Sequence, residues 1–202
     1  MLKVGITGGI GTGKTTACRL FEAFGVPIYY ADDRAKQLMH DDAQVRAQLI
    51  HTFGATVYDD DGKLDRAYLA NLVFKNEARL QQLNAIVHPA VFADGVAWQA
   101  AQAQGNALYT LKEAALLYET GSYADLDKII VVTAPEELRI QRVVQRDQTT
   151  EAAVRARMAK QWPQAEKEQR ADYLLHNTTV EALTAQVDAL HQQLTALAQA
   201  AG

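Results

Sequence analysis

Residues 5–16 read GITGGIGTGKTT, a glycine-rich stretch that continues the β-branched apolar run near the start of the sequence. Four residues separate Gly8 from Gly13, and Lys14 and Thr15 come next, so the stretch matches the phosphate-loop pattern Gly-x-x-x-x-Gly-Lys-Ser/Thr at every position. The run before the loop predicts a buried strand, and the pattern after it predicts a helix. Strand, loop and helix in this order form the context in which the pattern binds phosphate, and they decide the fold class.

The residues of this loop suit the binding of a nucleoside triphosphate. Glycines let backbone N–H groups turn inwards around phosphate oxygens, and the N-terminus of the following helix adds a partial positive charge. We expect Lys14 to reach the β- and γ-phosphates and the Thr15 hydroxyl to bind Mg²⁺. The predicted nucleotide-binding residues of the loop are Gly9, Gly11, Thr12, Gly13, Lys14, Thr15 and Thr16.

The rest of the sequence alternates short apolar runs with helical patterns. The runs that predict strands are residues 2–7, 26–30, 107–111, 128–133 and 173–176. Such alternation predicts an α/β fold of the phosphate-loop NTPase or kinase type, in which a five-stranded parallel sheet is covered by helices on both faces. Ligands of such sheets bind outside the carboxyl ends of the strands.

We divide the chain into a core, a helical acceptor-binding insertion and a lid. The core comprises residues 1–31, 106–146 and 172–202, the insertion residues 32–105, and the lid residues 147–171. The lid segment holds few large apolar side chains, so we expect it to be weakly anchored and to close over bound ligands. Pro89 predicts a helix boundary inside the insertion. Thr133 and Thr178, each followed three residues later by Glu, predict capping boxes.

Composition excludes several classes of protein. The 202 residues include 20 Lys and Arg against 24 Asp and Glu, so the net charge of −4 gives no general case for a nucleic-acid partner. The strongly apolar run at residues 129–132 is far shorter than the ~20 residues of a membrane-spanning helix. The single cysteine, Cys18, fits a reducing compartment. We therefore expect a cytoplasmic protein with a small-molecule substrate, and its oligomeric state is left open.

The remaining motifs narrow the kind of phosphate-loop protein. A GTPase requires the guanine-reading pattern Asn-Lys-x-Asp, which is absent from the sequence. A motor ATPase carries an apolar strand that is followed by Asp, whereas the apolar run at residues 129–132 is followed by Thr133. A dinucleotide site could use Asp32 for the ribose, but it would give the Gly-Lys-Thr triplet no role. A small-molecule kinase remains. Asp32, just past the second predicted strand, suits a base for a hydroxyl acceptor, whereas Asp33 suits a helix start.

The order of the longer motifs resembles one family. GITGGIGTGKTT, YYADDRAK, VHPAVF, KEAALLYETG, IIVVTAPEELRIQRVVQRD and ADYLLHN follow one another as they do in the dephospho-coenzyme A kinase family, from about residue 2 to about residue 190. The resemblance implies transfer of the γ-phosphate of ATP to the 3′-hydroxyl of the ribose of dephospho-CoA, which is the last step of coenzyme A synthesis.

The resemblance also implies roles for residues on the acceptor side. Asp32 matches the last Asp of the family's Asp-Ala-Asp and is implied to act as the base and to bind the acceptor, while Tyr30 stands where the first Asp would be. His88 matches the family's His-Pro, which looks like part of the acceptor-binding region. Leu116 and Glu119 match the family's Pro-Leu-Leu-x-Glu, although alanine replaces its proline, and they are expected to bind substrate.

Further candidates lie in the second half of the chain. Arg142 resembles the family's arginine near the nucleotide, and Arg157 on the lid is expected to stabilise charge on the transferring phosphoryl group. Asn177, after the last predicted strand, is a candidate for contact with adenine. Glu113 could assist Mg²⁺ through water or be a surface acid. Two other functions stay open, namely a different kinase with a hydroxyl acceptor, such as a nucleoside kinase, and a nucleotide-binding module without turnover.

Overall fold

The structure, a computed structural model, describes residues 1–74 and 76–200 and divides the chain into two compact units. The first unit comprises Met1–Tyr30 and the chain from Gln99 onward, and the second comprises Ala31–Trp98. Residue 75 of the predicted insertion and residues 201–202 of the predicted core lie outside the described residues. Within the described ranges, no helix has the length and apolar character needed to cross a membrane.

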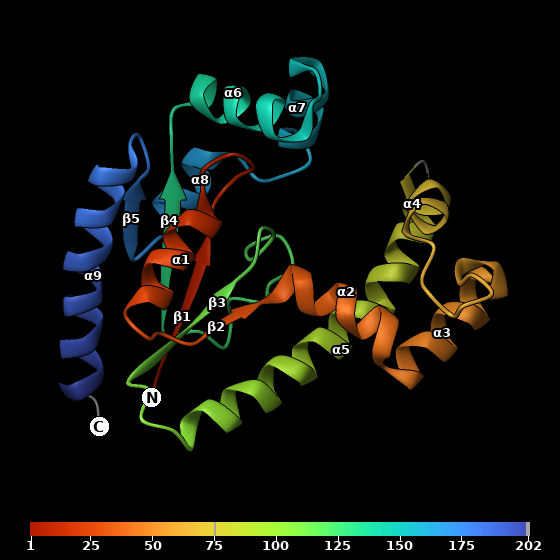
Figure 1. Cartoon of the computed structure of the whole chain (residues 1–202), viewed down its shortest axis with the longest axis horizontal. Coiled ribbons are helices and arrows are strands. Elements are labelled where there is room, and N and C mark those ends of the chain that lie inside the picture. The colour runs from red at the N-terminus through yellow and green to blue at the C-terminus, as the bar shows by residue number, and fades with distance from the viewer. Residues whose placement is uncertain (75, 201–202) are drawn as a thin grey trace. The chain divides into compact units, whose positions relative to one another are not determined.

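A five-stranded sheet forms the centre of the first unit (Figure 1). Its strands are β1 (Leu2–Thr7), β2 (Ile28–Tyr30), β3 (Tyr109–Glu113), β4 (Lys128–Thr133) and β5 (Tyr173–His176). They lie in the order β2-β3-β1-β4-β5, and every neighbouring pair is parallel. The predicted fold class is confirmed, and all five carboxyl ends meet at one edge of the sheet.

The other elements of the first unit are helices. They are α1 (Lys14–Ala23), α6 (Glu136–Asp147), α7 (Glu151–Met158), α8 (Gln164–Gln169), α9 (Val180–Ala200) and the end of α5 (Glu77–Ala103). Side chains alternate across a strand, so Val4 and Ile6 of β1 point to the same face. That face forms one buried cluster with Phe21 of α1 and Leu183 of α9. The core therefore holds α1 in place, with the phosphate loop at its N-terminus.

Two predicted strands have different boundaries in the structure. The second starts at Ile28 rather than at residue 26, because Pro27 has no N–H to donate and serves the sheet edge only through its carbonyl, which accepts a hydrogen bond from Leu111 at 3.0 Å. The third runs from Tyr109 to Glu113 rather than over residues 107–111. Glu113 is consequently the last residue of β3, at the carboxyl edge of the sheet.

Both predicted capping boxes are wrong. α6 has Pro135 at its N-cap without a side-chain cap, and the Thr133 hydroxyl donates a hydrogen bond to Glu168 instead. α9 is capped by Thr179, whose hydroxyl accepts a hydrogen bond from the Ala182 amide at 3.2 Å. The first prediction failed because spacing alone does not distinguish a threonine that ends a strand from one that starts a helix, and the second because the helix starts one residue later than the spacing indicated.

The second unit is helical. It contains α2 (Ala31–Asp41), α3 (Ala43–Phe53), a 3₁₀ turn (Ala55–Val57), α4 (Arg66–Phe74) and most of α5. Leu49, Phe53 and Leu69 contribute to its own buried cluster. Arg34 of α2 makes a double hydrogen bond with the Asp94 carboxylate of α5, with the Nε–Oδ2 distance at 2.9 Å.

Pro89 does not end a helix, contrary to the prediction. It lies inside α5, which continues from Glu77 to Ala103. Proline inside a helix removes one backbone hydrogen bond and usually kinks the helix at a cost of about 3 kcal/mol. The helix nevertheless continues through Pro89 over 27 residues, and Val87, two residues before it, is buried. His88 is therefore an interior helix residue rather than a terminal one.

Candidate functional site

The phosphate loop lies between β1 and α1, at the carboxyl edge of the sheet, and its backbone requires glycine. Gly11 has φ of 81° and Gly13 has φ of 87°, both in the left-handed region that other residues avoid. A Cβ on Gly11 would lie 2.5 Å from the Arg139 carbonyl oxygen, and one on Gly13 would overlap the side-chain amide of Asn177. These contacts explain why the loop needs its glycines.

Buried hydrogen bonds fix the second half of this loop. The Thr12 hydroxyl, fully buried, donates to the Gly9 carbonyl at 2.9 Å. The side-chain amide of Asn177 donates to the Thr12 carbonyl at 2.8 Å, and Asn177 is only 3% exposed. In this structure Asn177 thus holds the loop in shape from the end of β5. Its contact with adenine stays a prediction.

The Lys14 side chain lies against the loop and is largely shielded from solvent. Its Nζ donates to the Gly8 carbonyl at 3.0 Å and lies 3.9 Å from the Glu113 carboxylate, and its side chain is 12% exposed. Glu113 is buried at the end of β3. The loop therefore contains one ammonium group, with one carboxylate beside it.

The donors near the start of α1 suit a magnesium ion. Thr15 is exposed in the first turn of α1, and Glu113 supplies a carboxylate beside Lys14. Mg²⁺ prefers hard oxygen donors and usually takes one or two from the protein, with phosphates and water completing its shell. Among the described residues, no three His, Cys, Asp or Glu side chains gather into a metal-binding group. The two oxygen donors present fit an ion that is shared with nucleotide phosphates.

Two arginines of α6 contact the loop region. Arg142, a predicted nucleotide-binding residue, donates to the Asn177 carbonyl at 3.1 Å. Arg139 is 6% exposed, and its Nε donates to the Ile10 carbonyl at 3.0 Å. Burial lowers the pKa of Arg139 from its usual value. Arg139 was not among the residues predicted from the sequence, although its place one turn before Arg142 puts both side chains on the same face of the helix.

Arg157 lies near the end of α7 and is half-exposed. Its Nη1 lies 2.6 Å from the Asp147 carboxylate, which also accepts a hydrogen bond from Arg146. Hydrogen bonds from the two guanidinium groups hold the pKa of Asp147 well below its usual range. Arg157 is thus paired within the lid segment, and its action on a phosphoryl group stays a prediction.

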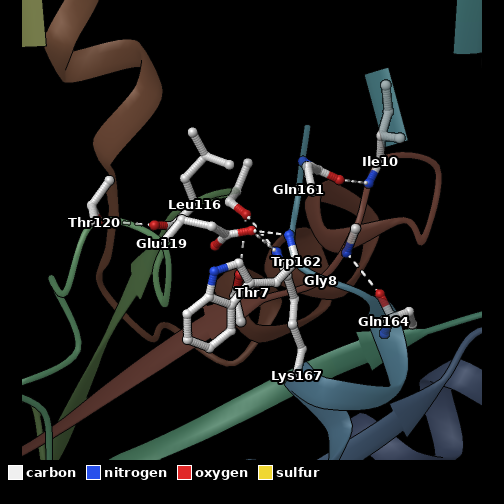
Figure 2. Close-up of polar contacts among 12 residues, drawn as sticks. Thr7, Gly8, Ile10, Leu116, Glu119, Thr120, Gln161, Trp162, Gln164 and Lys167 are labelled. Atoms are coloured by element: carbon white, nitrogen blue, oxygen red, sulfur yellow. Dashed lines mark hydrogen bonds and ion pairs between the residues drawn. The ribbon is translucent and has the colours of Figure 1, made fainter. Parts of the chain in front are cut away.

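The loop after β3 contains Leu116 and Glu119, both predicted to bind substrate. Leu116 is 40% exposed. One Glu119 oxygen accepts a hydrogen bond from the Trp162 amide at 2.9 Å and lies 2.6 Å from the Lys167 ammonium group, which is fully buried (Figure 2). The other oxygen is buried without a hydrogen-bond partner among the residues described. Glu119 therefore anchors residues of the predicted lid.

This anchoring differs from the weakly held lid that we expected. Val154 of α7 is fully buried against Ile140 and Val143 of α6, and Lys167 of α8 is fully buried beside Glu119. The sequence contains few large apolar residues here, but a buried ion pair and a helix-to-helix contact replace them. Neither can be read from the composition of the segment.

Two glutamines of the same segment bind the first half of the phosphate loop. The Gln161 side-chain oxygen accepts a hydrogen bond from the Ile10 amide at 2.9 Å, and the Gln164 side-chain oxygen accepts one from the Gly9 amide at 3.0 Å (Figure 2). Our sequence analysis assigned neither residue to the site. Their only signal in the sequence is that Gln161 lies one helical turn after Arg157.

The acceptor candidates of the second unit are exposed. Asp32 lies in the first turn of α2, two residues after β2, and makes no hydrogen bond or ion pair within the described part of the chain. Asp33 next to it pairs with Lys36 at 2.7 Å. His88 is exposed on α5, and partial desolvation lowers its pKa.

Tyr30, at the position of the first Asp in the family's motif, is the last residue of β2 in the first unit. Burial and a hydrogen bond with Glu22 raise the pKa of its hydroxyl.

Comparison with known proteins gives one consistent result. A family model described as dephospho-CoA kinase matches residues 2–182. A dephospho-CoA kinase of Salinibacter ruber is 44% identical over 177 residues, which cover 88% of this chain and 89% of the relative. One of Methylococcus capsulatus is 40% identical over 201 residues, or 99% of this chain and 100% of the relative. The solved dephospho-CoA kinase of Campylobacter jejuni superposes with a TM-score of 0.73 at 26% identity and covers 96% of each chain.

Proposed function

The chain belongs to the dephospho-CoA kinase family, and from this premise we infer that it transfers the γ-phosphate of ATP to the 3′-hydroxyl of the ribose of dephospho-CoA. This reaction is the last step of coenzyme A synthesis. The single observation that carries the function on this chain is its phosphate loop, complete in sequence and held at the carboxyl edge of a parallel sheet by Thr12, Asn177 and Arg139. That edge is where such sheets bind their ligands.

Positive charge and N–H donors of the first unit stabilise the negative charge of the nucleotide phosphates during the reaction. The loop amides of Gly11, Gly13 and Thr15 and the N-terminus of α1 surround the phosphates, and Lys14 turns from the Gly8 carbonyl to the β- and γ-phosphates. Arg142, held beside Asn177, contributes positive charge at the same edge. A preorganised group of donors stabilises charge on the transferring phosphoryl without having to be reorganised during the reaction. Arg157 adds a further cation once it leaves Asp147.

The Thr15 hydroxyl would hold Mg²⁺ together with the nucleotide phosphates. When bound, such an ion neutralises charge on the β- and γ-phosphate oxygens. Glu113 is the carboxylate placed to accept hydrogen bonds from water around it, because it ends β3 beside Lys14.

Asp32 acts as the general base. A ribose hydroxyl must lose a proton as it attacks the γ-phosphorus, and an ionised carboxylate within hydrogen-bonding reach accepts that proton and aligns the oxygen. Asp32 suits this task because it makes no competing hydrogen bond or ion pair among the described residues, whereas Asp33 is paired with Lys36. His88, Leu116 and Glu119 help to bind the acceptor.

The substrate is a small molecule, and we place the reaction in the cytoplasm without a nucleic-acid partner. The single cysteine, Cys18, supports this, because it lies on the buried face of α1 and burial raises the pKa of its thiol, which keeps the thiol in the unreactive protonated form. The net charge of −4 supports it as well.

An ADP-release assay with a panel of acceptors tests this function. The purified chain with ATP and Mg²⁺ is offered dephospho-CoA, adenosine, a pyrimidine nucleoside and shikimate in turn. We expect turnover with dephospho-CoA at least 10²-fold above the others, because a pocket that binds the whole acceptor discriminates in kcat/KM. Equal turnover with nucleosides would assign the chain to another kinase class, and ADP release that is independent of any acceptor would reject the proposal.

A further inference from the structure

The first half of the phosphate loop is held from outside the loop. The amides of Gly9 and Ile10 find their acceptors in Gln164 and Gln161, and the Ile10 carbonyl accepts from Arg139. We propose that Gln161 and Gln164 are positioning residues of the kinase, which hold these two amides and so keep the loop in the shape that binds ATP. This inference rests on the proposed function for the identity of the reaction, but not for the binding of the nucleotide.

The two amides have no acceptor within the loop itself. The inward carbonyl of Gly9 is used by the Thr12 amide and hydroxyl, and the carbonyl of Gly8 by Lys14. Backbone N–H groups in a part-buried position need a partner, and the glutamine oxygens supply it. Without them, Gly9 and Ile10 are free to turn, and ATP binding must then order them at an entropic cost.

Gln164 is itself fixed at a defined position. Its side-chain nitrogen donates to the Val132 carbonyl at 3.3 Å and to the Glu168 carboxylate at 3.1 Å. Glu168 in turn accepts from the Thr133 hydroxyl at the end of β4. The side-chain amide of Gln164 therefore joins the Gly9 end of the loop to the neighbouring strand β4. Exchanging its oxygen and nitrogen atoms would break the hydrogen bonds to Gly9, Val132 and Glu168.

Gln161 stands on an anchored segment as well. The amide of Trp162 next to it is bound by Glu119, and the Trp162 ring stacks on Tyr118 with ring centres 5.9 Å apart and planes inclined by 4°. Lys167, fully buried, pairs with the same Glu119 carboxylate (Figure 2). Because the segment around Gln161 is fixed by these contacts, the hydrogen bond from the Ile10 amide to Gln161 fixes the position of Ile10 as well.

Variants of the two glutamines test the inference. Gln161→Met and Gln164→Met keep side-chain length and remove the amide acceptor, and Gln169→Met, exposed on α8, is the matched control. The readouts are the Kd for ATP with Mg²⁺ by calorimetry without acceptor, the KM for ATP and for dephospho-CoA, and the unfolding temperature. We expect the Kd and KM for ATP to rise about two- to tenfold, the effect of losing the hydrogen bond to one loop amide, with the KM for dephospho-CoA unchanged.

The outcomes separate this inference from its premise. Unchanged ATP affinity in both variants overturns it, and so does a loss of affinity equal to that of Gln169→Met. If the chain fails to phosphorylate dephospho-CoA while the two variants still lose ATP affinity, the proposed function fails and the positioning role holds.

Amide exchange measured by NMR on the unaltered protein needs no variant and covers the case in which a substitution impairs folding. Without nucleotide, the amides of Gly9 and Ile10 are expected to exchange at least tenfold more slowly than that of the exposed Asn106. Exchange of both amides at the Asn106 rate overturns the inference.

Discussion

The residues predicted to bind the nucleotide and those predicted to receive the phosphate differ in how the protein holds them. Lys14, Asn177 and Arg142 each make hydrogen bonds to the backbone of the first unit, and Asn177 is almost completely buried. Asp32 and His88, in the second unit, are exposed, and Asp32 makes no polar contact with the residues described. Residues of the first group therefore contribute to the fold in addition to their proposed role in binding nucleotide, whereas the proposed role of Asp32 is in the chemistry alone.

The largest effect on activity is expected for Asp32→Asn, which should leave stability unchanged. Asp32→Asn preserves size and removes the charge that accepts a proton, so kcat should fall about 10²- to 10⁴-fold. The free energy of unfolding should stay within about 0.5 kcal/mol of the original, as at other exposed sites. Steady-state kinetics and urea unfolding of the same preparation measure the two quantities.

Asp33→Asn is the control for this variant. It removes only an exposed ion pair with Lys36, which contributes at most about 1 kcal/mol, and activity should be nearly unchanged. A severe loss of turnover in Asp33→Asn with a mild one in Asp32→Asn would reverse the assignment of the base.

Lys14→Met should lower both kcat/KM and the free energy of unfolding. The loss of one preorganised cation at the phosphates is expected to lower kcat/KM about 10²- to 10³-fold. The lost hydrogen bond from its ammonium group to the Gly8 carbonyl should lower the free energy of unfolding by about 1–2 kcal/mol. Lys63→Met, in an exposed turn, should change neither. Unchanged stability in Lys14→Met would mean that its contacts with Gly8 and Glu113 contribute nothing to the fold.

Asn177→Ala should affect stability more than chemistry. It leaves the buried Thr12 carbonyl without its donor, which costs about 1–3 kcal/mol in unfolding free energy. The affinity for ATP should fall several-fold because the loop loses a support. Thermal unfolding with and without ATP measures both, and Asn106→Ala, exposed in a turn, is the control. Full stability in Asn177→Ala would remove this residue from the group that holds the loop.

The smallest effect is expected at the lid. Arg157→Gln should lower kcat about tenfold if its guanidinium reaches the phosphoryl group, with unfolding unchanged within about 0.5 kcal/mol. Arg155 is the matched control, since its side chain is also 51% exposed and its partners are Glu136 and Glu151. Equal activity of Arg157→Gln and Arg155→Gln would leave Arg157 as a surface partner of Asp147 only.

The sequence predicted what local patterns determine. The phosphate loop was predictable because spacing from Gly8 to Thr15 is set by the chemistry of one turn, and the parallel sheet was predictable from alternating β and α runs. Pro89 misled the prediction because packing and neighbouring hydrogen bonds outweigh a single helix breaker. Thr133 misled it because its true partner, Glu168, is 35 residues away.

The supports of the loop were not predictable for the same reason. Arg139 and Gln161 bond to Ile10 across 129 and 151 residues of sequence. No local pattern marks a glutamine in a polar helical segment as the partner of a distant amide. The position of Asp32 just after a strand, by contrast, could be predicted, because the carboxyl end of a parallel strand is itself a local feature, and its role as the base stays a prediction.

Phosphorus NMR of the product tests the central claim most directly. The chain is mixed with ATP, Mg²⁺ and dephospho-CoA, and the reaction is followed until ATP is consumed. We predict one new phosphomonoester resonance, coupled to the 3′-hydrogen of the ribose, that grows in step with ADP and forms about 10²- to 10⁴-fold more slowly when Asp32 is replaced by Asn. Appearance of ADP with inorganic phosphate alone, or of a phosphomonoester on another oxygen, would contradict the account.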